Sequence, residues 1–192
     1  MITFIIGTDT DVGKTYYGKK LIDEGKKLIK PIETGKNSFQ NINLSDCYQY
    51  ARLQNRNIEE INLYFFSEAV SPHLAAEIDN LFIDIKLLKS FILEKKDAFV
   101  ELAGGLYVPL TRGYTQLDLL KEISKIEKIH VDLVIDNKLG CINHALLTIH
   151  VLRDNHIPIR EVFINSKGKV KAKIMLDNER VIMDFIGNGI QR

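Results

Sequence analysis

The sequence predicts an α/β fold, in which a single doubly wound, mostly parallel sheet carries helices on both faces. Short runs of apolar and β-branched residues recur between segments with helical periodicity, and this alternation is typical of successive βα units. Three of these runs are almost continuously apolar, as expected for strands that are covered on both sides. The sequence has no internal repeat, low-complexity tract or interdomain linker, so we expect one domain over residues 1–192.

The strand candidates differ in strength. Four strong ones are residues 3–6, 98–102, 131–135 and 161–164, and two weaker ones are residues 27–32 and 181–186. In a doubly wound sheet, ligands bind beyond the carboxyl ends of the strands. The candidate motifs follow strand candidates, so we expect them to converge at that edge.

Helical spacing of apolar residues predicts helices over residues 16–24, 46–53, 84–95, 117–123 and 142–152. Ser45 stands in the N-cap position of the second helix, and Gly25 is a suitable C-cap for the first. Ser71 and Pro72 predict another helix start, because proline is favoured at the first helical position. We expect residues 55–71 to form a loop with at most a short helix.

The composition narrows the class of partner and compartment. Hydrophobic residues make up 45% of the chain and charged residues 27%, as in ordinary globular domains. A net charge of +1 gives no electrostatic case for nucleic acid or an anionic membrane as a partner, and the apolar runs are far short of the ~20 residues that span a bilayer. Cys47 and Cys141 form no metal-ligand spacing. With no signal-type N-terminus, we expect a cytoplasmic protein.

Residues 7–15, GTDTDVGKT, lie between the first strand candidate and the first helix candidate. This is the layout of a phosphate-binding loop, in which backbone N–H groups and a helix N-terminus face a di- or triphosphate. Lys14 would reach the β- and γ-phosphates, and the Thr15 hydroxyl would ligate Mg²⁺. The fit to G-x-x-x-x-G-K-[ST] is imperfect, since Thr8 stands at the first glycine position and Gly7 comes one residue early. The alternative is a simple glycine turn with Lys14 in solvent.

A second lysine and two acidic residues extend this candidate site. Lys30 begins the segment KPIETG after a strand candidate, where it could stabilise charge during phosphoryl transfer or lie in a solvated turn. Together with Thr15, the carboxylates of Asp46 and Glu101 form an oxygen set that suits Mg²⁺. Asp46 could instead serve only the helix N-terminus. Glu101 ends an apolar run, where an unpaired carboxylate would be costly to bury.

Three further polar positions have two interpretations each. The turn KLGCINH at residues 138–144 offers free helix N–H groups suited to a carboxylate, but it could be an ordinary turn with a buried Cys141. Asn165 ends the last strong strand, where it could bind a nucleobase or cap a turn. We interpret His73 as a packing or capping residue, and the other histidines show no metal-ligand spacing.

The order of these segments is more specific than any one of them. GTDTDVGKT, KPIETG, an aspartate at a helix start, SPHLAA, VELAGGLYVPL and KLGCINHALLT closely resemble the dethiobiotin synthetases of the P-loop NTPase superfamily, from about residue 3 to Asn165. The resemblance implies a Mg-ATP-dependent ligase of biotin biosynthesis. It would insert CO₂ or bicarbonate carbon between the amines of 7,8-diaminononanoate (7,8-diaminopelargonate), through a carbamate and a carbamic–phosphoric anhydride. It also implies a homodimer whose substrate site is shared between subunits.

The resemblance assigns roles residue by residue. It implies Lys30 as the principal catalytic lysine, Lys14 as the second, and metal ligation by Thr15, Asp46 and Glu101. The implied nucleotide-binding positions are Asp11, Val12, Gly13, Lys14, Thr15, Tyr16, Asp46, Glu101, Leu102, Ala103, Gly104 and Asn165. The implied substrate-binding positions are Thr10, Thr34, Ser71, Leu139, Gly140, Cys141 and Asn143. In this family the 138–143 turn grips the substrate carboxylate of the neighbouring subunit.

Three departures from the family pattern leave alternatives open. Leu102 stands where glycine is usual, the unit between Thr15 and Lys30 is short, and the segment after Asn165 lacks the family's base-binding proline region. Use of GTP or CTP therefore stays open. Other interpretations are a P-loop amidoligase acting on another carboxylic acid, an inactive homologue, and a nucleotide-switched partner ATPase. Against the last, residues 8–12 contain no signature lysine, and no C-terminal amphipathic membrane helix is evident.

Overall fold

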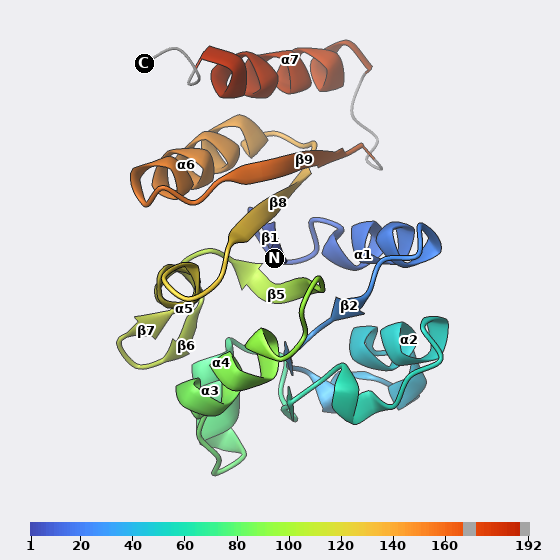
Figure 1. The fold of residues 1–192 in the computed structure, drawn as a ribbon. Coiled ribbons are helices and arrows are strands. Elements are labelled where there is room, and N and C mark those ends of the chain that lie inside the picture. The colour runs from blue at the N-terminus through green and yellow to red at the C-terminus, as the bar shows by residue number, and fades with distance from the viewer. Residues whose placement is uncertain (167–171, 189–192) are drawn as a thin grey trace.

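A computed structural model describes residues 1–166 and 172–188 and has a five-stranded parallel sheet at its centre (Figure 1). In spatial order the strands are β2 (Leu28–Ile29), β5 (Phe99–Gly105), β1 (Ile2–Gly7), β8 (Ile129–Asp136) and β9 (Ile159–Asn165). Every neighbouring pair is parallel. The four strong strand candidates and the doubly wound sheet are thereby confirmed.

Helices cover both faces of this sheet, which explains why its central strands are continuously apolar. Helix α1 (Lys14–Asp23) lies on one face, and α5 (Gln116–Ser124) and α6 (Cys141–Asp154) lie on the other (Figure 1). All six residues of β1 are buried between them. Since parallel strands joined by right-handed crossovers place their connections on the faces, this burial follows from the chain order.

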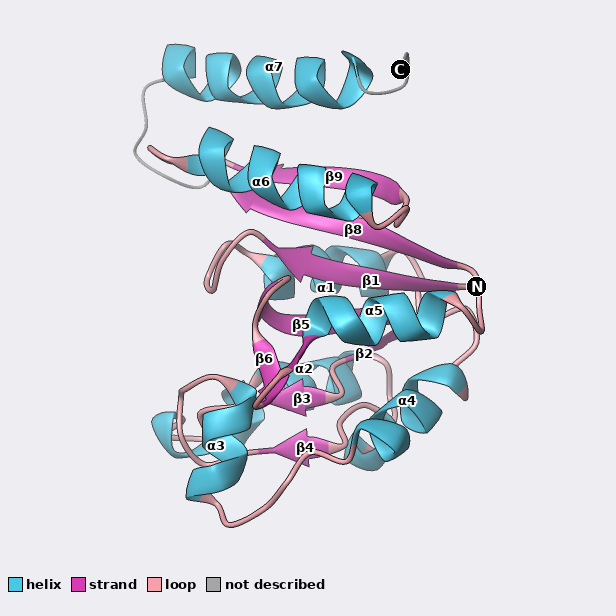
Figure 2. Ribbon diagram, turned by 90° about the vertical axis from the view of Figure 1, so that its left-hand side faces the viewer, coloured by secondary structure: helices cyan, strands magenta, loops and turns pink. Residues whose placement is uncertain are grey.

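The weaker strand candidate at residues 27–32 forms two short strands instead of one. Strand β2 ends at Ile29, and β3 (Ile32–Glu33) pairs in parallel with β4 (Tyr64–Phe65) beyond the β2 edge of the main sheet (Figure 2). Pro31 separates the two strands, because it has no N–H to continue a ladder. The interruption leaves Lys30 between two strand ends. The expected loop over residues 55–71 holds a 3₁₀ turn at Ile58–Glu60 and also β4, which was not expected.

The remaining elements lie on the β2 and β5 side of the sheet (Figure 1). The expected helices are confirmed as α2 (Asp46–Leu53), α3 (Pro72–Ile78) and α4 (Ile85–Leu93), with Asp84 capping α4 through its side chain. Strands β6 (Pro109–Thr111) and β7 (Tyr114–Thr115) form a small antiparallel hairpin. No helix in the described ranges is long and apolar enough to cross a membrane.

The prediction of a strand at residues 181–186 is wrong, because these residues belong to helix α7 (Ala172–Asn188). The helix stacks outside α6 at the β9 edge of the molecule (Figure 1). Ile182 is fully buried in a cluster with side chains of β8 and α6, including Ile135 and Ala145. This tertiary contact overrides the strand preference of the β-branched pair Val181–Ile182. Helix α7 is therefore held on the protein by its contacts with α6 and β8.

Candidate functional site

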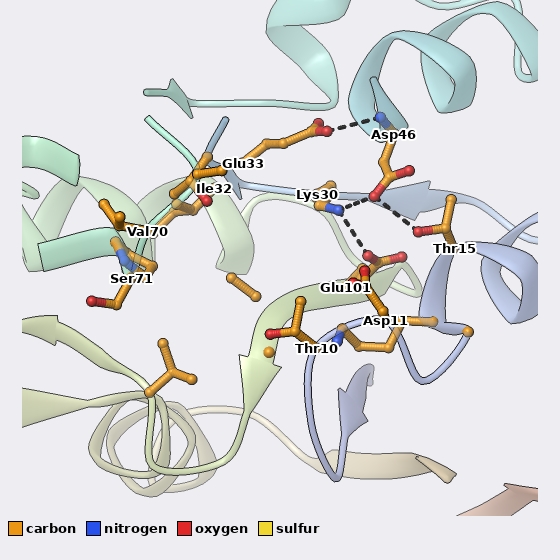
Figure 3. Close-up of a pocket in the computed structure, with 18 of the residues that line it drawn as sticks. Thr10, Asp11, Thr15, Lys30, Ile32, Glu33, Asp46, Val70, Ser71 and Glu101 are labelled. Atoms are coloured by element: carbon orange, nitrogen blue, oxygen red, sulfur yellow. Dashed lines mark hydrogen bonds and ion pairs between the residues drawn. The ribbon is translucent and has the colours of Figure 1, made fainter. Parts of the chain in front are cut away.

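A pocket of about 780 Å³ opens at the carboxyl ends of β1, β2 and β5, where the sequence predicted the site (Figure 3). Its polar side comes from the loop after β1, the first turn of α1, the segment around β3, the start of α2 and the end of β5. The lining residues are Thr10, Asp11, Gly13, Lys14, Thr15, Lys30, Ile32, Glu33, Thr34, Phe39, Asp46, Ala69, Val70, Ser71, Pro72, Glu101, Ala103, Gly104 and Val108.

The loop between β1 and α1 has the strand–loop–helix layout of a phosphate-binding loop. Asp11 (φ 57°) and Gly13 (φ 103°) adopt left-handed conformations, which turn the chain into α1. Lys14 Nζ lies back across the loop and donates to the Asp9 carbonyl oxygen at 3.1 Å. Gly7 takes the role of the first glycine of the motif. A Cβ at this position would lie 2.6 Å from the Asp9 carbonyl oxygen and 2.9 Å from Lys14 Nζ. Gly7 thus provides the close approach that the consensus places one residue later.

Lys30 lies between two carboxylates at the base of the pocket (Figure 3). Its Nζ donates to Asp46 Oδ2 and lies 2.9 Å from Glu101 Oε1. The Thr15 hydroxyl donates to the same Asp46 oxygen at 2.8 Å. Burial by itself lowers the pKa of Lys30, but the charges of Glu101, Asp46 and Glu33 outweigh it and hold that pKa well above its usual range. Lys30 is therefore a permanent cation in this site.

The buried environment acts differently on the neighbours of Lys30. Burial lowers the pKa of Lys14, and the Glu101 carboxylate only partly offsets that effect. Burial would raise the pKa of Asp46, but the Lys30 charge and the hydrogen bonds from Lys30 and Thr15 bring it below its usual range. The site thus holds one strongly cationic lysine beside an ionised carboxylate.

Glu101 is 1% exposed, and its two oxygens have different surroundings. Oε2 accepts a hydrogen bond from the Tyr50 hydroxyl. Oε1 forms the ion pair with Lys30 but accepts no geometrically satisfactory hydrogen bond from any described residue. Tyr50 is not among the site residues that the sequence predicted. Its position four residues after Asp46, on the same face of α2, was the available signal.

Glu33 is a second functional residue that the sequence analysis missed. Its carboxylate oxygens accept the backbone N–H groups of Asp46 and Cys47, each at 2.8 Å, so it caps the N-terminus of α2. Ser45 holds the N-cap position as predicted, but its side chain caps neither of these groups and lies 3.6 Å from Cys47 Sγ. An acidic side chain is favourable at a helix N-terminus. Glu33 thereby fixes the helix turn that carries Asp46.

The structure brings most of the predicted site residues together in the pocket and leaves others outside its lining. Those outside are Val12, Tyr16, Leu102, Leu139, Gly140, Cys141, Asn143 and Asn165. Leu102 is buried in the hydrophobic core, whereas Glu101 and Ala103 line the pocket. Since successive residues of a strand point to opposite faces, the side chain of Leu102 does not narrow the pocket.

Asn165 braces the phosphate-binding loop from the end of β9. Its Nδ2 donates to the Val12 carbonyl oxygen at 2.9 Å, and this contact leaves no room for a side chain at Gly13. The role of Asn165 toward a nucleobase stays a prediction. Tyr16 is 42% exposed on α1, with its ring centroid 6.1 Å from that of Phe163.

The turn at residues 138–143 lies away from the pocket of its own chain. Gly140 adopts a left-handed conformation (φ 90°) as the N-cap of α6, and Cys141 is buried beneath it. Leu139 is 99% exposed at the tip of the turn. The contribution of this turn to a neighbouring subunit stays a prediction.

Comparisons with known proteins agree on the family. A family model described as an AAA domain (AAA_26) matches residues 3–188. The ATP-dependent dethiobiotin synthetase BioD of Francisella tularensis subsp. tularensis (strain WY96-3418) is 40% identical over 172 residues, covering 81% of this chain and 73% of that protein. The protein of the same name from Legionella pneumophila (strain Corby) is 41% identical over 165 residues, covering 80% and 74%.

A solved structure shows the same fold at low sequence identity. A ParA family ATPase from Chlorobium tepidum TLS is similar with a TM-score of 0.54 at 12% identity, covering 95% of this chain and 80% of that one. At this identity the likeness concerns the fold alone.

Proposed function

The chain belongs to the ATP-dependent dethiobiotin synthetases, ligases of biotin biosynthesis, and we propose that it closes the ureido ring of dethiobiotin in the pocket between Lys14 and Lys30. One amine of 7,8-diaminononanoate takes up CO₂ and loses a proton to become a carbamate. The carbamate oxygen attacks the γ-phosphorus of ATP and ADP leaves, which forms a carbamic–phosphoric anhydride. The second amine then attacks the carbonyl carbon and loses a proton, and phosphate leaves as the ring closes.

The observation that carries this proposal is the meeting of two buried lysines at one pocket. Lys14 comes from the phosphate-binding loop, and Lys30 comes from the segment between β2 and β3. A carbamate and a γ-phosphate are both anionic, so bringing them together requires positioning and neutralisation of charge. Lys14 would contact both groups, and Lys30 would stabilise the carbamate and the charge that develops during transfer. The carboxylates beside Lys30 keep it protonated for this role.

The triphosphate would lie along the loop at Asp11, Val12, Gly13, Lys14, Thr15 and Tyr16. The first N–H groups of α1 point out of the helix N-terminus, where an anion is favoured. Ala103 and Gly104 bring backbone to the same pocket from the end of β5. Asn165 would reach the base, although in this structure its amide holds the loop.

The donor set fits Mg²⁺. Glu101 Oε1 is buried without a satisfactory hydrogen bond from a described residue, and Asp46 and Thr15 meet beside Lys30. Magnesium uses one or two carboxylates and leaves its other positions to phosphate oxygens and water, so the two carboxylates suffice. Thr15, Asp46 and Glu101 would hold the ion, which would neutralise phosphate charge when bound.

The rest of the pocket suits a diamino acid with a long aliphatic chain. Thr10, Thr34 and Ser71 place hydroxyl groups on the lining, and apolar residues such as Phe39 and Val108 line the same pocket. We infer that the substrate carboxylate is held by the 138–143 turn of a second subunit in a homodimer. Two features support this: the turn does not line the pocket of its own chain, and it leads into the N-terminus of α6, where an anion is favoured.

The test is product formation by the purified protein. We expect dethiobiotin, identified by mass spectrometry, from MgATP, bicarbonate and 7,8-diaminononanoate, with GTP and CTP in parallel reactions to report base preference. Absence of product with every nucleotide would overturn the proposal. Turnover of another carboxylic acid with ammonia or glutamine would instead identify an amidoligase.

A further inference from the structure

Tyr50 is a buried tyrosine whose hydroxyl contacts a carboxylate of the site. The side chain is 0% exposed, and its hydroxyl donates to Glu101 Oε2, which leaves Glu101 Oε1 facing Lys30. Tyr50 follows Asp46 by four residues, so both side chains leave the same face of α2. One helix therefore supplies a carboxylate to the site and also a donor that holds the second carboxylate.

Helix α1 makes room for this hydroxyl. Gly18 lies in the interior of α1, where glycine disfavours a helix. A Cβ at position 18 would lie 2.6 Å from Tyr50 Oη and 3.0 Å from Leu28 Cδ1. The first distance is shorter than real Cβ contacts, and the second is at their tight limit. The glycine and the tyrosine are thus two independent features of this chain that serve the same contact.

We propose that Tyr50 is a positioning residue for Glu101: its hydroxyl fixes one carboxylate oxygen so that the other faces Lys30 and the phosphate-binding loop. This inference rests on the proposed function, in which Glu101 holds the magnesium of MgATP. A carboxylate without the Tyr50 donor can rotate and share both oxygens with Lys30. It would then present a less favourable ligand to the metal.

The substitution Tyr50→Phe removes the hydroxyl and keeps the ring. We expect binding of Mn²⁺ in the presence of ADP, followed by electron paramagnetic resonance, to weaken about 10- to 100-fold, as is typical when a partner of a metal ligand is removed. The Mg²⁺ concentration for half-maximal activity should rise in parallel, and kcat at saturating Mg²⁺ should change less.

The matched control is Tyr17→Phe. Tyr17 is also a buried tyrosine whose hydroxyl donates to a buried carboxylate, Asp132 Oδ2, at 2.9 Å. It does not line the pocket, so its loss should lower thermal stability without weakening the binding of Mn²⁺. A purely structural role for Tyr50 would make the two variants alike in metal binding, which would overturn the proposal.

A second variant approaches the same contact from the other helix. Gly18→Ala displaces the Tyr50 hydroxyl while it adds a better helix former, so we expect it to weaken Mn²⁺ binding as Tyr50→Phe does. It carries the test if Tyr50→Phe does not fold, and unchanged Mn²⁺ binding in Gly18→Ala would then count against the proposal. Since Mn²⁺ binding with ADP requires no ligase reaction, a wild-type protein that binds the metal but makes no dethiobiotin would contradict only the proposed function.

Discussion

Lys30 Nζ and Glu101 Oε1 lie 2.9 Å apart at the base of the pocket, and both side chains are almost completely buried. A buried ion pair is costly to separate, because removing one partner leaves the charge of the other without compensation. The lysine proposed for catalysis and a carboxylate proposed for the metal are therefore linked. Changes to either residue should affect stability as well as activity.

Replacing Lys30 should nearly abolish product formation. We expect Lys30→Ala to lower kcat by at least about 100-fold, the order seen when one charge-stabilising donor is removed. It should also destabilise the fold by roughly 3–5 kcal/mol, because Glu101 and Asp46 lose their cation. Both effects are measured by steady-state kinetics and urea denaturation. The exposed residue Lys26 provides a control, and equal activities of Lys26→Ala and Lys30→Ala would refute the role of Lys30.

The cap that Glu33 forms on α2 should be measurable. In Glu33→Gln only one side-chain oxygen remains for the N–H groups of Asp46 and Cys47. We expect a loss of about 1 kcal/mol in the free energy of unfolding, the usual size of a helix cap, and a higher KM for MgATP. The exposed Glu24→Gln is the comparison. A KM equal to that of the wild type would show that the cap does not position Asp46.

The ionisation of Asp46 predicts a pH dependence of stability. Burial by itself would raise the pKa of Asp46, but Lys30 and Thr15 lower it by more than burial raises it. The folded pKa therefore lies below the unfolded value of about 3.9. The contribution of Asp46 is therefore fully present above about pH 4 and is lost as the pH falls through the folded pKa.

This prediction is checked by urea denaturation of the wild type and Asp46→Asn between pH 3 and pH 7. The difference in the free energy of unfolding should be constant near neutrality and shrink in acid. The exposed Asp23→Asn, measured over the same pH range, is the comparison. A difference that grew on acidification would mean that the pKa shift has the opposite sign.

The two roles of Asn165 can be separated by kinetics. Asn165→Ala removes the hydrogen bond to the Val12 carbonyl oxygen, and loss of about 1 kcal/mol should raise KM for ATP about fivefold. If the residue only braces the loop, the KM values for ATP and GTP will rise equally. A change in the ratio of the two would instead assign it to the base.

The shared substrate site can be tested by mixing two impaired proteins. Lys30→Ala should lack a catalytic centre, and Leu139→Asp should lack the substrate-binding turn. If the turn serves the neighbouring subunit, mixed dimers contain one complete site and activity should partly return after the two are refolded together. If the activity of the mixture stays at the level of the separate variants, the turn serves the pocket of its own chain.

The sequence was sufficient for features that depend on neighbours in the chain. The helix at Asp46–Leu53 was predicted to the residue, and Gly13, Lys14 and Thr15 follow β1 at the spacing of a phosphate-binding loop. Local periodicity and capping set such elements. The convergence of Lys30 and Glu101 was also predictable, because the carboxyl ends of parallel strands meet at one edge of the sheet.

Tertiary structure alone decided which side chains complete the site. Glu33 caps a helix that begins 13 residues later, and Tyr50 holds a carboxylate 51 residues away. No spacing rule connects such pairs, since their distance is set by how α2 packs on the sheet. The same reason explains α7, where burial of Ile182 against α6 outweighed a local strand preference. Local chemistry determined the elements and the reactive groups, and long-range packing determined the partners that orient them.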